Sequence, residues 1–279
     1  MEKTKAILVD ITKCIGCRAC EQACKQLHLP ALAAQCVALA ETAAREHQPY
    51  LGSLEALLTT ELEEREQHTI THRLREAHFS RVKTLEAFDF RECPAVSAMR
   101  LAELAGGDYI ARAEPVVRIG ESGAGKTHLL TGLCIAACRQ KRRVRFTAAA
   151  ALVNELVEAK AQLQLRRVLA RWARYDVIAI DEVGDVPLAE VGAALLFQVI
   201  AERAEQRVVL LTTKEPFSEW TQVIPNARLC KALLDRITDR AHSIETGTES
   251  YRFRRTLARK RGRGTPPRPE RRSGEKPDG

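Results

Sequence analysis

A glycine-rich stretch near the middle of the chain constrains the fold more than any other feature. It consists of Gly120, Glu121, Ser122, Gly123, Ala124, Gly125, Lys126 and Thr127. This stretch fits the pattern GxxxxGK(S/T), follows an apolar run and precedes an apolar helical segment. In such a loop, backbone N–H groups face phosphate oxygens at the N-terminus of a helix. The stretch therefore predicts an ATP site, because a glycine-rich turn matching by chance would not have this strand and helix context.

Within this loop, two side chains have predicted roles. Lys126 would neutralise the charge of the β- and γ-phosphates, and the Thr127 hydroxyl would ligate Mg²⁺. A second apolar run, beginning at Tyr175, ends in the acids Asp181 and Glu182. Asp181 would hold Mg²⁺ through water, and Glu182 would act as the base that polarises the attacking water. Two acids can also form an ordinary solvated strand end, but the upstream phosphate loop favours the chemical role.

Short apolar runs alternate with longer helical segments from Val116 onward. The runs that predict strands are Val116–Ile119, Val144–Phe146, Val177–Ile180, Val208–Leu211 and Ser243–Glu245. Helices are expected after Lys126, Ala149, Leu188 and Lys231. This alternation predicts an α/β sandwich around a parallel five-stranded sheet.

Composition and pattern divide the chain into four predicted segments. Residues 1–26 carry a cysteine run, 27–90 form a small helical N-terminal domain, 91–257 form the α/β domain, and 258–279 are a disordered basic tail. Between Arg252 and Gly279 lie eleven Lys or Arg and three Asp or Glu, so this end accounts for the whole net charge of +8. A basic tail beside a neutral body indicates a polyanionic partner such as nucleic acid, although it can also simply aid solubility.

The chain shows neither a membrane span nor a secretory signal in its pattern. No apolar run approaches the roughly 18 residues that a spanning helix needs. The N-terminal MEKTKAILVDITK lacks the apolar core and cleavage site of a signal peptide. We therefore expect a cytoplasmic protein with no membrane partner and with reduced cysteines.

Several strings in the chain resemble one known family. They are KTLEAFDF (Lys83–Phe90), GESGAGKTHL, VRFTAAAALVNEL (Val144–Leu156), AIDEVGDVPL (Ala179–Leu188), PFSEW (Pro216–Trp220), ALLDR (Ala232–Arg236) and ESYR (Glu249–Arg252). In this order and spacing, over roughly residues 27–257, they resemble the IstB-like helper ATPases of insertion sequences, which are similar to DnaC helicase loaders. The resemblance implies an AAA+ P-loop ATPase that forms homo-oligomers on double-stranded DNA and activates a partner transposase.

The resemblance also implies roles for residues outside the phosphate site. Arg236 resembles the arginine that reaches a neighbouring subunit's γ-phosphate, where such a cation could raise the rate about 10³–10⁵-fold. The helix around Ala149–Arg167 resembles the element that contacts DNA in related initiators. Five basic residues flank it and suit phosphate contacts: Lys141, Arg142, Arg143, Arg166 and Arg167. The alternatives are an ordinary surface ion pair for Arg236 and a solvated basic face for the others.

One position departs from the family pattern. The end of the fourth strand usually carries an Asn that orients the attacking water, whereas this chain reads Thr212, Thr213, Lys214. A lysine ammonium cannot accept a hydrogen bond. The departure predicts slow hydrolysis with intact nucleotide binding, unless Thr213 takes over the role of the missing Asn.

The N-terminal cysteines form a separate motif. Cys14, Cys17, Cys20 and Cys24 have the spacing of ligands to a 4Fe–4S cluster, and their surroundings resemble the start of ferredoxin-type electron-transfer subunits. Because no second cysteine run follows and the resemblance ends near Gln26, we interpret the segment as the remnant of a gene fusion. A single cluster, or a zinc site on the same thiolates, remains the alternative. Cys134 and Cys138 are expected to be core residues of a helix.

Three other functions stay open on the sequence alone. A DnaC-like helicase loader in DNA replication would share the same fold. An iron–sulfur redox protein would use the N-terminal cysteines, although most of the chain is committed to the ATPase body. A module that binds nucleotide without turning it over would be consistent with Lys214.

Overall fold

The structure is a computed structural model that describes residues 19–46, 49–185, 188–203, 206–224 and 226–245. Its contacts divide the chain into two compact units, residues 1–76 and 77–279. The predicted boundary between helical and α/β domains lay at 90/91, whereas residues 77–90 group with the second unit. None of the described helices is long and apolar enough to span a membrane.

The first unit is helical, and its described elements are α1 (Ala19–Gln26), α2 (Pro30–Arg45) and α3 (Tyr50–Glu76). Helix α2 begins with Pro30 at its first position, but Leu29 before it has no side chain that can cap the free backbone N–H groups. Glu61 of α3 takes over this role, because one carboxylate oxygen accepts hydrogen bonds from the N–H groups of Ala31 (3.0 Å) and Leu32 (3.1 Å). The N-terminus of helix α2 is therefore capped by a residue of the neighbouring helix α3 rather than by a residue that precedes α2.

The second unit contains one parallel five-stranded sheet in the order β2-β3-β4-β1-β5. Its strands are β1 (Val116–Ile119), β2 (Val144–Ala148), β3 (Val177–Val183), β4 (Val208–Thr213) and β5 (His242–Glu245). The sheet confirms the predicted α/β fold and five parallel strands. Strands β2, β3 and β4 continue past their predicted ends.

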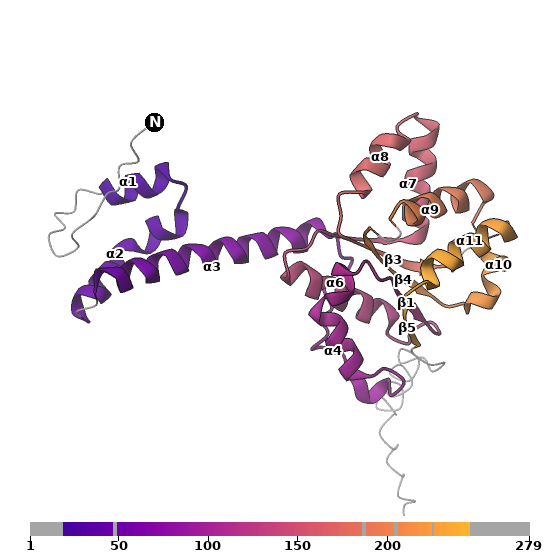
Figure 1. Ribbon diagram of the computed structural model, residues 1–279, viewed down its shortest axis with the longest axis horizontal. Helices are drawn as coiled ribbons and strands as arrows, with labels where there is room; N and C mark the ends of the chain where they lie inside the picture. Colours follow the sequence, from indigo (N-terminus) through magenta and orange to yellow (C-terminus); the bar gives the residue numbers. More distant parts are fainter. Residues whose placement is uncertain (1–18, 47–48, 186–187, 204–205, 225, 246–279) are drawn as a thin grey trace, which may run out of the picture. The chain divides into compact units, whose positions relative to one another are not determined.

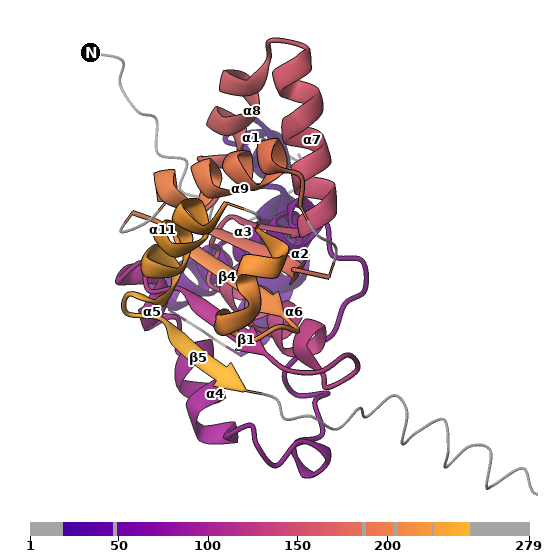
Figure 2. The ribbon, with the colours of Figure 1, turned by 90° about the vertical axis from the view of Figure 1, so that its right-hand side faces the viewer.

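Helices cover both faces of this sheet (Figure 1; Figure 2). The helical elements are η2 (Phe90–Glu92), α4 (Ala98–Gly106), α5 (Asp108–Ala111), α6 (Lys126–Arg139), α7 (Ala149–Ala161), α8 (Leu165–Trp172), α9 (Glu190–Arg203), η3 (Phe217–Glu219), α10 (Trp220–Val223) and α11 (Ala227–Thr238). Helices α7, α9 and α11 share one apolar cluster with alternate strand residues such as Val117, Ile178 and Leu211. Helix α6 packs on the opposite face, together with α4.

Helix α6 is buried along most of its length, and both Cys134 and Cys138 are buried in it. This confirms that the two thiols are core residues of a helix. Residues 77–90 lie along the same helix: the His128 ring nitrogen is 2.8 Å from the Thr84 carbonyl, and Arg139 pairs with Glu86 at 2.6 Å. Leu85 packs so close to Gly132 that an added Cβ would be 2.4 Å from it. This segment, which we call the strap (residues 77–90), is thus part of the second unit.

Candidate functional site

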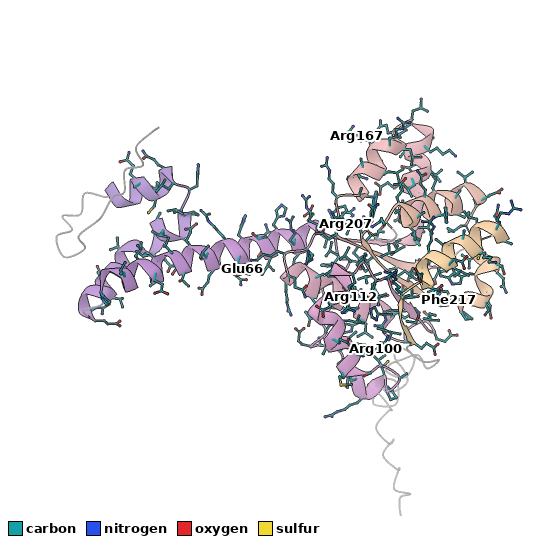
Figure 3. All side chains as sticks on the ribbon, viewed as in Figure 1. Glu66, Arg100, Arg112, Arg167, Arg207 and Phe217 are labelled. Carbon is teal, nitrogen blue, oxygen red and sulfur yellow. The ribbon has the colours of Figure 1, made fainter. Side chains whose placement is uncertain are left out.

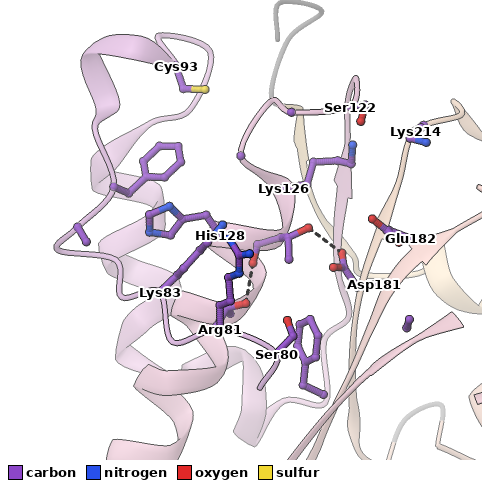
Figure 4. A pocket seen from close by; sticks show the side chains of 18 of the residues that line it. Ser80, Arg81, Lys83, Cys93, Ser122, Lys126, His128, Asp181, Glu182 and Lys214 are labelled. Carbon is purple, nitrogen blue, oxygen red and sulfur yellow. Dashed lines mark hydrogen bonds between the residues drawn. The ribbon is translucent and has the colours of Figure 1, made fainter. Parts of the chain in front are cut away.

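A pocket of about 920 Å³ lies at the carboxyl edge of the sheet. Its walls are the phosphate loop with the start of α6, the ends of β2 and β3, Lys214 after β4, and residues of the strap and η2. In Figure 4, Lys214 and Glu182 lie on one side of Lys126, with His128 and Lys83 on the other. The pocket therefore brings the two predicted motifs together, although they are far apart in sequence.

The phosphate loop turns its lysine inward. Lys126 is the first residue of α6, and its ammonium donates hydrogen bonds to the carbonyls of Gly120 (2.5 Å) and Glu121 (2.9 Å). Burial lowers the pKa of Lys126, Lys214 lowers it further, and the carboxylates of Asp185 and Asp181 oppose these effects. A bound polyanion would offset the burial of this charge far better than two carbonyl dipoles do.

Thr127 and Asp181 lie next to each other, as their predicted shared role requires. The Thr127 hydroxyl is 3.3 Å from one oxygen of Asp181, and the Thr212 hydroxyl donates to the same oxygen at 2.5 Å. A hydroxyl and a carboxylate are the hard oxygen ligands that suit Mg²⁺. Thr212 is fully buried and was not predicted to take part, but it fixes the Asp181 carboxylate toward the loop.

Glu182 has an unusual backbone. Its φ of +60° lies in the left-handed region, which glutamate rarely adopts. The backbone N–H donates to the Thr212 hydroxyl at 2.8 Å, and this bond helps to hold the conformation. The residue is exposed between two buried neighbours, Asp181 and Val183, and it lines the pocket. The left-handed backbone conformation therefore places the Glu182 carboxylate at the pocket, although the rest of strand β3 is buried.

The residues fit a nucleotide with Mg²⁺, and one buried atom supports this. Asp185 Oδ1 has no hydrogen-bond partner among the described residues although it is buried at the pocket wall. An unsatisfied carboxylate oxygen beside two lysines, Lys126 and Lys214, indicates a place where ligands or water complete the polar network. Among the described residues, no group of three or more His, Cys, Asp or Glu could hold a metal by itself.

The strap supplies pocket residues that the sequence patterns did not assign to the site. Arg81, Lys83 and Phe88 line the pocket, and the Phe88 ring packs edge-on against His128 with centroids 5.2 Å apart. Lys83 and Phe88 belong to the KTLEAFDF string that carries the family resemblance, whereas Arg81 lies before that string; all three fall within the predicted N-terminal domain. Aromatic and basic groups here would suit the base and the phosphates of a nucleotide.

Gly125 offers a direct test of this packing. Its φ is +85°, and a Cβ added there would lie 2.8 Å from a ring carbon of Phe88. We expect Gly125→Ala to lower the free energy of unfolding by about 1–3 kcal/mol and to weaken nucleotide binding, since both the strain and the clash distort the loop. Urea unfolding and titration with a fluorescent ATP analogue measure the two effects. Gly106→Ala is the control, because a Cβ there meets nothing within 4 Å; equal behaviour of the two variants would contradict the expectation.

Arg236 lies outside this pocket. It is on α11, where its guanidinium is 5.8 Å from the Phe197 ring centroid and donates to the Ala201 carbonyl at 3.3 Å. The structure thus does not bring Arg236 to the phosphate loop of its own chain. The five predicted DNA-contacting residues are also away from the pocket: all are exposed, and Arg167 is labelled on α8 in Figure 3.

The cysteine run is only partly described. Cys14 and Cys17 lie outside the described residues, whereas Cys20 and Cys24 fall on α1 and Cys24 is buried. Neither the fold nor the family match supports the iron–sulfur prediction, because the match begins at residue 22 and leaves out all but Cys24.

Comparison with known proteins assigns the chain to a family. The IstB-like ATP binding proteins match residues 22–259. This chain belongs to that family. An insertion-sequence ATP-binding protein of Sinorhizobium fredii is 34% identical over 241 residues, which cover 86% of this chain and 81% of the relative. The putative ATP-binding protein of insertion sequence IS21 from Pseudomonas aeruginosa is 33% identical over 216 residues, which cover 77% of this chain and 82% of that relative.

A solved structure resembles this chain in its fold. DnaA from Aquifex aeolicus, bound to AMPPCP, superposes with a TM-score of 0.50 at 18% identity, over 65% of this chain and 55% of that one. At this identity the likeness shows the fold alone. It agrees with the α/β sandwich that the alternation of strands and helices predicted.

Proposed function

We propose that this protein is an ATP-dependent helper of DNA transposition. In this proposal it binds and hydrolyses ATP, assembles into homo-oligomers on double-stranded DNA, and activates a transposase. The observation that carries the proposal is the pocket in which Lys126, Thr127, Asp181 and Glu182 meet, within a chain of the IstB-like family.

Each of the four pocket residues has a separate task. Lys126 would exchange its bonds to the loop carbonyls for phosphate oxygens, and the Thr127 and Asp181 oxygens would hold Mg²⁺. A magnesium ion held there would supply positive charge beside the phosphates. Glu182 would accept the proton of the attacking water, because this residue is exposed on a strand that is otherwise buried and it lines the pocket.

Arg236 would act on a neighbouring copy of the chain. Its position on α11, outside its own pocket, is the arrangement that a contribution between subunits requires. This would make hydrolysis depend on assembly, since an isolated chain would lack the cation that stabilises the transition state. In its own chain Arg236 makes a long 3.3 Å hydrogen bond to the Ala201 carbonyl and a contact with the Phe197 ring, and reaching outward would replace these two interactions.

DNA binding would use the exposed basic residues around α7 and α8. We expect replacement of Arg166 and Arg167 by alanine to weaken duplex binding and to reduce the slope of log affinity against log salt by about 0.9 for each lost phosphate contact. Fluorescence anisotropy with labelled duplex at several salt concentrations measures both. Arg100→Ala, an exposed arginine on α4, is the control (Figure 3). A double variant with the wild-type slope would exclude these arginines from the interface.

The decisive test of the proposal combines two measurements on the full chain. ATP turnover is measured with and without duplex DNA, and the mass of the assembly on DNA is measured in parallel. Turnover stimulated by DNA, together with large assemblies, would support the proposal. Nucleotide binding and assembly without turnover would leave a switch that is not an ATPase, and no binding would refute the function. Copurification with a replicative helicase instead of a transposase would identify a helicase loader.

A further inference from the structure

Lys214 occupies the place where β4 reaches the phosphate loop. The carbonyl of Thr213, the residue before it, accepts a hydrogen bond from the Gly120 N–H at 3.2 Å, which ties the end of the strand to the start of the loop. Lys214 lines the same pocket as Lys126, and its side chain is 34% exposed. The backbone thus places a long, flexible cationic side chain beside the loop.

The ammonium of Lys214 is held by an aspartate. Lys214 Nζ lies 2.6 Å from Asp185 Oδ2, and Asp185 belongs to the turn that follows β3. This hydrogen bond raises the pKa of Lys214, with smaller contributions from Glu182 and Glu215. The lysine is therefore a full cation at neutral pH.

Asp185 acts on the second lysine as well. Burial lowers the pKa of Lys126; the carboxylate of Asp185, which lines the same pocket, opposes this shift, and the charge of Lys214 adds to it. The other oxygen, Asp185 Oδ1, is buried without a hydrogen-bond partner among the described residues. The Asp185 carboxylate therefore interacts with two lysines beside the phosphate loop, while one of its own oxygens lacks a hydrogen bond. An anion that binds these lysines more strongly, such as a phosphate group, would displace Asp185 from them.

We propose that Lys214 contacts the γ-phosphate of ATP and makes the site prefer ATP to ADP, while Asp185 holds the lysine when no γ-phosphate is present. The inference rests on the proposed nucleotide binding at this loop. ADP ends one phosphate short of Lys214, so it would leave the Lys214–Asp185 pair intact. Lys214 is then a specificity-determining residue rather than a water-positioning one, because an ammonium has no acceptor for the water proton.

The test is the ratio of ATP to ADP affinity, measured by isothermal titration with Mg²⁺ and a non-hydrolysable ATP analogue. We expect Lys214→Met to weaken the analogue about 10–100-fold, the range for a lost charge-assisted bond to phosphate, while ADP affinity stays within about twofold. Unchanged ADP affinity also shows that the variant is folded. Lys214→Arg should keep most of the preference, and Lys231→Met, at an exposed position of α11, should keep all of it.

Asp185→Asn provides the opposite change. Freeing Lys214 and removing a nearby negative charge should strengthen binding of the ATP analogue several-fold more than binding of ADP. A wild-type ratio in Lys214→Met would overturn the role of Lys214 alone. A wild-type protein that binds neither nucleotide would instead overturn the proposed function together with the inference.

Discussion

Replacing Lys126 with methionine is expected to abolish nucleotide binding, with a loss of at least about 100-fold in ATP affinity. The reason is geometric: the ammonium is buried at the start of α6, inside the loop, and no other described cation lies on the loop itself. DNA-bound assemblies that depend on ATP should disappear as well. Titration with an ATP analogue and sedimentation on duplex DNA measure the two consequences.

This variant separates binding from folding. Because burial already lowers the pKa of Lys126, replacing the cation by an apolar side chain of similar length should leave the free energy of unfolding unchanged or higher. Lys160→Met, at an exposed position of α7, controls for the loss of one positive charge. If Lys126→Met binds ATP within about threefold of wild type, the loop is not the phosphate site.

Replacing Glu182 with glutamine is expected to lower the rate of ATP hydrolysis about 10²–10⁴-fold while leaving ATP affinity nearly unchanged. The amide has the same size and keeps the backbone bond to Thr212, so only proton acceptance is lost. ATP-bound assemblies should then persist on DNA. Single-turnover hydrolysis and dissociation from labelled duplex measure the two effects.

The matched control is Glu158→Gln, because Glu158 is exposed on α7 outside the pocket. Normal turnover in Glu182→Gln would show that another group accepts the proton. Loss of ATP binding would show that the carboxylate is needed to build the site rather than for the chemistry.

The sheet and the phosphate loop could be predicted because both are local in sequence. The loop is one continuous stretch, and each strand is an apolar run bounded by polar residues. The ends of the strands were less visible, since β4 continues through the polar Thr212 and Thr213. Both threonines are fully buried. The Thr212 hydroxyl donates a hydrogen bond to Asp181, and the Thr213 hydroxyl donates one to the Glu215 carbonyl. Polarity alone does not reveal that such bonds exist.

The rest of the site depends on contacts between distant segments. Asp185 and Lys214 follow neighbouring parallel strands, so the register of β3 and β4 brings them together, and no sequence pattern predicts that these two residues pair. The predicted boundary at 90/91 differs from the contact grouping, which places the strap with the second unit, for a related reason. It has almost no regular secondary structure, and its conformation comes from packing against α6.

The strap changes where the autonomous part of this protein begins. A fragment that begins at residue 91, the boundary that the sequence suggested, would lack Leu85, which packs against Gly132, and Phe88, which packs against Gly125. It would also lose one wall of the pocket and expose apolar surface on α6 that the intact chain covers. The smallest piece that keeps every wall of this pocket therefore starts at about residue 77, and the strap is a structural component of the α/β unit rather than a linker that leads to it.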